Sequence, residues 1–145
     1  MPYKNIEIAG PIPAYQQAPK TEHFYKGFST VNASTNSVNL YDFSLIQQDI
    51  LNNFNTRRGE RVMNPKFGSI IWELLMEPIT DQVRQALVDD ITNICKNDPR
   101  VIPTNIILTE YPSGYLLELT LNLRNTDQST TMKFAFDQNL GLVQQ

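Results

Sequence analysis

Leucines at every second position, from Leu117 to Leu123, constrain the fold of this chain more than any other feature. Glu118, Thr120 and Asn122 alternate with them. Because successive side chains of a β-strand point to opposite faces, this period of two predicts a strand with one apolar and one polar face. Such a strand needs neighbouring strands and a covering layer to bury its apolar face.

Two further segments predict strands on either side of this one. Apolar side chains alternate through residues 106–109, and residues 111–115 (Tyr-Pro-Ser-Gly-Tyr) supply a hairpin turn in which proline presets φ and glycine closes the turn. Residues 125–128 turn the chain again. A third alternating set follows, consisting of Met132, Phe134 and Phe136. The pattern predicts a three-stranded antiparallel β-meander.

A helix pattern begins at Asp42, a residue type that favours the N-cap position. Apolar residues then recur three and four positions apart, and the helix is expected to end near Asn55. This stripe consists of Phe43, Ile46, Ile50 and Phe54. A short apolar stretch at residues 70–75 predicts one or two further helical turns, stopped by Pro78.

A second long helix is expected after Thr80, which is suited to cap it. Asp81 lies in its first turn and Lys96 in its last, as the helix dipole favours. Asn97-Asp98-Pro99 ends it. Its apolar stripe consists of Val83, Leu87, Ile91, Ile94 and Cys95.

Together these segments predict an α+β domain in which two main helices pack on the three-stranded meander. With 145 residues, the chain has room for one domain, expected at residues 41–137. Eight residues are expected mostly in its core: Leu117, Leu119, Leu121, Val83, Leu87, Ile91, Ile46 and Ile50.

The two ends of the chain are expected to lie outside this domain. Prolines and a polar tract interrupt residues 1–40, which we expect to form an extended arm that becomes ordered in an assembly. Phe24, Tyr25 and Phe28 are the candidate anchors of this arm on a partner. Residues 138–145 are expected to form a C-terminal tail. The meander has two edges that another chain's strand could join; alternatively, the chain's own tail or arm covers the edge of the last strand.

Composition argues against several classes of function. The net charge is −3 and the cations are scattered, which disfavours nucleic-acid binding. No apolar run is long enough for a membrane span, and the amino terminus does not resemble a secretory signal. His23 is the only histidine, and Cys95 is the only cysteine and is expected in the core. We therefore expect no metal and no cofactor.

Charged residues gather around turns at two places. Arg57, Arg58, Glu60 and Arg61 surround Gly59, and Phe67 follows within ten residues. Glycine permits a bend with positive φ, so these charges can meet at a turn. The second place is Asp98-Pro99-Arg100, after the second long helix. Taken alone, the first could be a solvated turn, in which exposed ion pairs contribute little, and the second a mere helix stop.

The order and spacing of these motifs, with Phe67-Gly68 and Glu77-Pro78 between them, resemble the baseplate wedge proteins of contractile-tailed phages. That family also includes the baseplate subunit of type VI secretion systems. The resemblance runs from about Leu40 to Phe136. The family's last motif is usually Glu-Pro-Arg, so Asp98 is one methylene shorter here, which puts the partner of that carboxylate in question.

The resemblance implies a structural subunit that starts sheath assembly, located in the virion tail baseplate after synthesis in the host cytoplasm. The implied fold is similar to a domain of the sheath subunit, to whose sheet neighbouring subunits add strands. Implied partners are the helical bundle of other wedge proteins, the tail sheath protein, and tail tube or hub proteins, in a hetero-oligomeric, six-fold baseplate. No nucleic acid or membrane is implied. A non-viral contractile secretion system is the alternative setting.

A lysozyme label has also been attached to this family, which makes a cell-wall glycosidase the alternative activity. Glycoside hydrolysis needs two carboxyl groups flanking one bond, one of them with a raised pKa. The candidates are Glu60, Glu73 and Glu77. Glu60 lies between arginines that would keep it ionised, and nothing in the sequence sets a second carboxylate opposite Glu73. The sequence therefore favours a protein that is not an enzyme.

Overall fold

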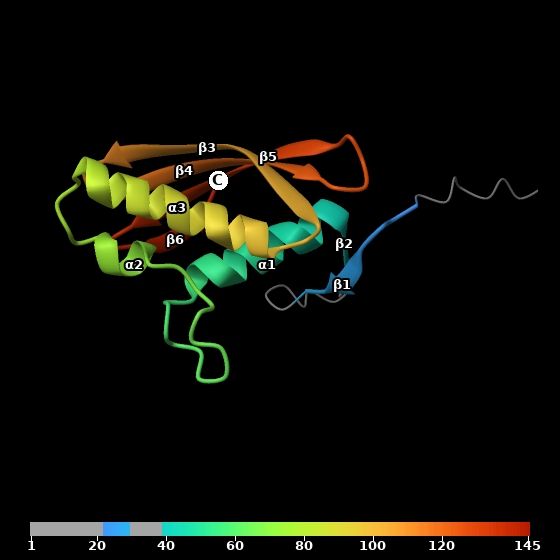
Figure 1. Cartoon of the computed structure of the whole chain (residues 1–145), viewed down its shortest axis with the longest axis horizontal. Coiled ribbons are helices and arrows are strands. Elements are labelled where there is room, and N and C mark those ends of the chain that lie inside the picture. Colours follow the sequence, from blue (N-terminus) through green and yellow to red (C-terminus); the bar gives the residue numbers. More distant parts are fainter. Residues whose placement is uncertain (1–21, 30–38) are drawn as a thin grey trace, which may run out of the picture.

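The computed structural model describes residues 22–29 and 39–145. One antiparallel sheet with the strand order β3-β4-β5-β6 forms one layer, and the helices lie on one of its faces (Figure 1). The strands are β3 (Val101–Tyr111), β4 (Gly114–Leu123), β5 (Ser129–Asp137) and β6 (Gly141–Gln144). The helices are α1 (Asp42–Asn55), α2 (Ile71–Leu74) and α3 (Asp81–Asn97). No helix in these residues is long and apolar enough to cross a membrane.

The sheet has four strands, so the expectation of a three-stranded meander was wrong. Strand β6 pairs with residues 134–137 of β5, and its Leu142 packs against the core. Gly141 begins this strand at a φ of 77°, a conformation that glycine adopts without a steric penalty. The strand was missed because only Leu142 and Val143 are apolar in it, too few to show a period of two.

The expected core is correct at seven of its eight positions. The leucine row of β4 is buried, as are Ile46, Ile50, Leu87 and Ile91, whereas Val83 near the start of α3 is half-buried. Phe54 of α1 makes edge-to-face contacts with Phe134 and Phe136 of β5. The apolar faces of helices and sheet thus meet in one core.

A second sheet precedes α1. Strand β1 (Lys26–Phe28) pairs with β2 (Asn39–Tyr41), and the chain then turns directly into α1. The sequence predicted Asp42 as the N-cap of this helix, and this prediction was wrong. Asp42 is instead the first residue of α1, and its φ is 45°. Its carboxylate accepts hydrogen bonds from the backbone N–H groups of Phe24 and Tyr25, at 2.9 and 3.0 Å. These bonds to an earlier segment draw the side chain away from the helix end.

The candidate arm anchors have different environments. Tyr25 is half-buried against the core, and its hydroxyl accepts a hydrogen bond from Asn125 at 2.9 Å. Phe24 and Phe28 are exposed. The remainder of the expected arm, residues 1–21 and 30–38, lies outside the described residues. The domain boundaries 1–40, 41–137 and 138–145 stay predictions.

The two long edges of the meander differ. Within the described part of the chain, no strand pairs with the outer edge of β3, which is 11 residues long. The outer edge of β5 is covered by β6 along residues 134–137, and the Gln145 N–H reaches the carbonyl of Lys133 at 3.0 Å. The chain's own C-terminal residues therefore cover part of the β5 edge and leave the β3 edge open.

Candidate functional site

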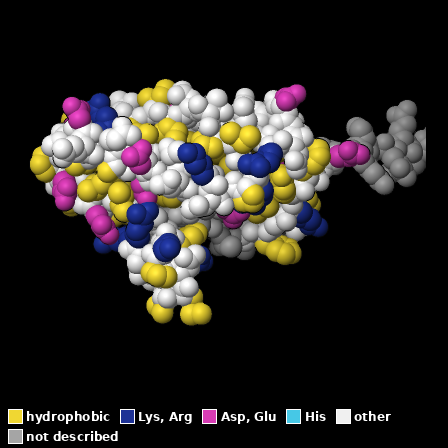
Figure 2. Space-filling view, viewed as in Figure 1, with side chains coloured by type: hydrophobic (Ala, Val, Ile, Leu, Met, Phe, Trp, Pro, Cys, Tyr) yellow, Lys and Arg dark blue, Asp and Glu magenta, His cyan; other side chains and the backbone are white. Residues whose placement is uncertain are grey.

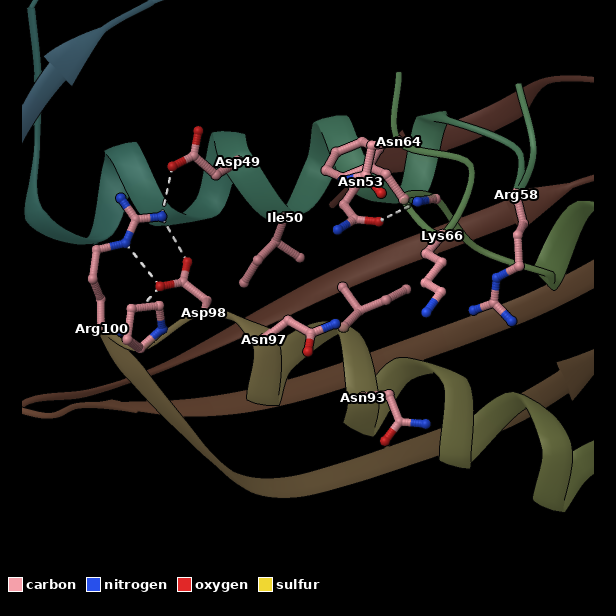
Figure 3. A pocket seen from close by; sticks show the side chains of 14 residues that line it. Asp49, Ile50, Asn53, Arg58, Asn64, Lys66, Asn93, Asn97, Asp98 and Arg100 are labelled. Atoms are coloured by element: carbon pink, nitrogen blue, oxygen red, sulfur yellow. Dashed lines mark hydrogen bonds and ion pairs between the residues drawn. The ribbon is translucent and has the colours of Figure 1, made fainter. Parts of the chain in front are cut away.

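A polar groove of about 540 Å³ runs between α1, α3 and the loop that joins α1 to α2. Figure 3 shows Asn64 and Lys66 of the loop on the same side as α1, with Asn93 and Asn97 of α3 across from them. Within residues 22–29 and 39–145, the side chains of these four residues make no hydrogen bond or ion pair. The groove therefore offers amides and one ammonium group to a partner.

One end of the groove is closed by Arg100. Its guanidinium donates to both carboxylate oxygens of Asp98, at 2.8 and 2.6 Å, and to Asp49 of α1 at 2.6 Å. Burial alone would raise the pKa of Asp98, but the hydrogen bonds from Arg100 outweigh it and hold that pKa below its ordinary value. The carboxylates of Asp98 and Asp49 raise the pKa of Arg100, although burial alone would lower it. This cluster is a fixed ion-pair network.

The loop from Arg57 to Ser69 forms the other end of the groove. Its two ends pair as an isolated parallel bridge between Arg57 and Ser69. The Ser69 N–H donates to the carbonyl of Thr56 at 2.9 Å, and the Gly68 N–H donates to the Asn53 side chain at 3.1 Å. The base of the loop is thereby fastened to the end of α1.

Asp90 of α3 holds this loop from the other side. It is 4% exposed, and it accepts hydrogen bonds from the Ser69 hydroxyl at 2.9 Å and the Ile70 N–H at 3.1 Å. It also forms an ion pair with Arg58. A buried carboxylate is costly without such partners. Asp90 therefore binds the beginning and the end of the loop at one point.

Two glycines shape the loop. Gly59 has a φ of 86°, and its N–H donates to the carbonyl of Pro65 at 3.0 Å. Gly68 has a φ of 104°, and a Cβ there would lie 2.6 to 2.8 Å from backbone atoms of Thr56 and Arg57. Gly68 thus allows a close backbone approach that a side chain would prevent.

The remaining charged residues of the first motif make contacts within their own loop. Glu60 accepts a hydrogen bond from the Arg57 N–H at 3.0 Å, and the Arg61 guanidinium lies 4.3 Å from the centre of the Phe67 ring. The two charged motifs form separate clusters at two ends of one groove. Asp98 and Arg100 meet, whereas Arg58 pairs with Asp90. Pro99 and Phe67 line the groove itself.

Sequence reasoning missed Asp49, Asp90 and Ser69. Asp49 lies on the exposed side of α1, where an acidic residue has no distinguishing signal. Asp90 did have a recognisable signal in the sequence. It follows the same helical repeat as Leu87, Ile91 and Ile94, so a carboxylate falls on the apolar stripe of α3. A charge in such a place predicts a buried partner.

The carboxylates considered for glycoside hydrolysis are not paired in a pocket. Glu73 and Glu77 are exposed, and Glu60 is bound to its own loop. Trp72, the residue before Glu73, donates to the carbonyl of Phe54 at 2.6 Å and contacts the ring of Phe136.

The histidine and the cysteine are likewise engaged. Cys95 is buried, and burial, with the nearby charge of Asp98, raises the pKa of its thiol to about 12. His23 lies 3.0 Å from Asp42. Among the described residues, no group of three or more His, Cys, Asp and Glu side chains could hold a metal ion.

The fold is that of an α+β protein, with helices on one face of an antiparallel sheet. Residues 43–128 match the model of the family described as baseplate wedge protein gp25, more than half of the chain. The chain belongs to this family.

A solved structure supports the fold. It is that of a protein from Geobacter sulfurreducens provisionally named a tail lysozyme, with a TM-score of 0.53 and 20% identity. The alignment covers 63% of this chain and 90% of that one. None of the curated proteins compared with the chain matches it significantly.

Proposed function

We propose that this chain is a structural subunit of the baseplate wedge of a contractile phage tail and nucleates the sheath, with no catalytic step. The observation that carries this proposal is the 11-residue edge of β3, with which no strand pairs among the residues that the structure describes. An exposed edge offers a row of backbone donors and acceptors to an extended strand of another protein. The sheath protein is the proposed donor of that strand.

The groove supports a second contact, with the helical bundle of the other wedge proteins. The groove presents the side chains of Asn64, Lys66, Asn93 and Asn97, which have no partner among the described residues. The Arg100 cluster and the Asp90-bound loop fix its two ends. A preformed polar surface loses little conformational entropy on binding. The proposed partner-binding residues are those of the two motifs that carry the family resemblance: Arg57, Arg58, Gly59, Glu60, Arg61, Phe67, Asp98, Pro99 and Arg100. These contacts would place the chain in a six-fold hetero-oligomer, with tail tube or hub proteins nearby.

Sheath nucleation can be tested with purified wedges and sheath protein, with sheath formation followed by electron microscopy. Ile107 on β3 is 45% exposed and Val143 on β6 is 42% exposed, which makes them a matched pair on the two edge strands of the sheet. Lysine on an edge strand discourages strand addition. Ile107→Lys should delay or abolish sheath formation, while Val143→Lys should not. If neither variant changes nucleation, the β3 edge is not the template.

The name of the structural relative makes glycosidase activity the second candidate. The exposed position of Glu73 argues against it, since the acid catalyst of a glycosidase typically lies in apolar surroundings. A turbidity assay on peptidoglycan separates the two functions. Lysis by the purified protein that disappears in Glu73→Gln would establish the enzyme and contradict the structural proposal. Sheath and tube genes beside this one, without secretion genes, would favour a phage over a secretion system.

A further inference from the structure

The tip of the loop between α1 and α2 carries two almost fully exposed apolar side chains. Val62 is 91% exposed and Met63 is 93% exposed. The loop projects from the body of the protein (Figure 1), and Figure 2 shows apolar side chains at its end, with Lys and Arg side chains closer to the body. Exposed apolar side chains gathered at a projecting point are typical of a contact site.

Hydrogen bonds within the loop hold the backbone that carries these two side chains. The Gly59 N–H donates to the carbonyl of Pro65 at 3.0 Å, and the Asn64 N–H donates to the carbonyl of Arg61 at 3.1 Å. The stacking of Arg61 on Phe67 adds a side-chain contact across the loop. A tip that is already ordered loses little entropy when it binds, so two side chains can contribute usefully to affinity.

Charge indicates what the tip binds. Four cations and one carboxylate lie between Arg57 and Ser69, so the loop has a formal charge of +3, whereas the whole chain has −3. The remainder of the chain therefore carries −6. An anionic lipid surface or a nucleic acid would repel that remainder, whereas an acidic site of limited size on a protein would meet the loop alone.

We propose that Val62 and Met63 insert into an apolar recess on another baseplate protein, and that Arg57 and Lys66 contact carboxylates around that recess. Neither of these two side chains has a hydrogen-bond or ion-pair partner in the described parts of the chain. This inference rests on the proposed function, because it assumes a neighbour in the baseplate. It adds a contact at the loop tip that shares Lys66 with the groove and is separate from the β3 edge.

The contact can be located by photo-crosslinking in assembled baseplate wedges that contain the full chain. A benzophenone amino acid replaces Met63 in one variant, Met76 in the control and Asn93 of the groove in a third. Met76 is also exposed, at 73%, but lies after α2. The Met63 position should cross-link to an apolar segment of another baseplate protein that is flanked by more Asp and Glu than Lys and Arg. The Met76 position should not label that segment.

Affinity provides the second measurement, with purified wedge complexes that lack this subunit as the probe. Met63→Ser should weaken incorporation on the order of 10-fold, whereas Met76→Ser should leave it unchanged. Arg57→Glu, outside the groove lining, should weaken it and Lys96→Glu, on the exposed side of α3, should not. The loss in Arg57→Glu should be smaller at high salt.

The outcomes separate this inference from the proposed function. Cross-links from Asn93 but none from Met63 would overturn the tip contact and leave the wedge function intact. Cross-links from Met63 to lipid, to nucleic acid or to a segment without excess carboxylates would also overturn it. Failure of the wild-type chain to enter wedges at all would overturn both.

Discussion

Arg100 binds Asp98, two residues before it, through two parallel hydrogen bonds: Nε donates to Oδ1 at 2.8 Å and Nη2 to Oδ2 at 2.6 Å. The Arg100 N–H also donates to Oδ1, at 3.0 Å. Because the same guanidinium reaches Asp49, the residues that stop α3 are also fastened to α1. The shorter carboxylate of Asp98 thus has its partner within the chain.

Replacing Arg100 should separate folding from assembly. Arg100→Ala is expected to cost about 1–3 kcal/mol, since two carboxylates lose their donor, and to leave the domain folded while wedge or sheath assembly fails. Arg100→Lys keeps the charge but cannot make the paired bonds, so its assembly should be intermediate. Thermal unfolding by circular dichroism and co-sedimentation with wedge proteins measure the two effects. An Arg100→Ala protein that is unfolded would make the motif a purely structural tie.

Lowering the pH should reduce the stability that the ionised Asp98 carboxylate gives to the fold. Its folded-state pKa lies below the ordinary value, so the ionised carboxyl stabilises the fold above about pH 4, and this stabilisation is lost as the pH falls through the folded pKa. The difference in Tm between the wild type and Asp98→Asn should therefore be large at pH 7 and shrink toward pH 2. Asp127→Asn, an exposed change in the β4–β5 turn, serves as the control. A Tm difference that is constant with pH would contradict this account.

Asp90 should be the most sensitive polar position of the loop region. Asp90→Ala leaves Arg58, the Ser69 hydroxyl and the Ile70 N–H without their acceptor, which should cost about 3–5 kcal/mol. Asp89→Ala is the neighbouring control, and because Asp89 is exposed it should change stability by about 0.5 kcal/mol or less. Urea unfolding measures both. Equal effects at the two positions would show that the buried carboxylate does not fasten the loop.

The two loop glycines provide a matched test of backbone strain against steric clash. Both have positive φ, but a methyl group at Gly59 meets no atom within 4 Å, whereas one at Gly68 meets backbone atoms. Gly59→Ala should cost about 1 kcal/mol, from φ alone. Gly68→Ala should cost about 3 kcal/mol or more, because the pairing of Arg57 with Ser69 must open. Similar unfolding free energies for the two variants would argue against the close approach.

The amino-terminal segment should detach without unfolding the domain. Asp42→Ala removes the acceptor of the Phe24 and Tyr25 N–H groups, and limited proteolysis within residues 22–29 should become faster while Tm changes by only a few degrees. Deletion of residues 1–40 should also spare folding and weaken incorporation into wedges. A sharp fall in Tm on deletion would instead show that this segment belongs to the domain.

Periodic apolar patterns made most of the main fold predictable. The leucine row of β4 and the stripes of α1 and α3 each bury a continuous face, and Thr80 caps α3 by accepting a hydrogen bond from the Val83 N–H at 3.3 Å. Strand β6 has too few residues for a pattern. Its pairing depends on the free edge of β5, which is a tertiary property.

The site was predictable only in part. Asp98 and Arg100 are close in sequence, so their contact follows from the turn at Pro99. The pairing of Arg58 with Asp90 joins residues 32 positions apart and depends on how α3 packs beside the loop. Local spacing does not encode such a contact, although the carboxylate on the apolar stripe of α3 indicates that one exists.

The hydrogen bond between Tyr25 and Asn125 spans 100 positions of the chain, whereas β3 to β6 are joined as successive hairpins. Contacts between distant residues form late in folding because closing a long loop costs more entropy. The sheet and its helices should therefore form first, and Tyr25 should dock last. By the same reasoning, its release is among the first events of unfolding, well before the meander opens.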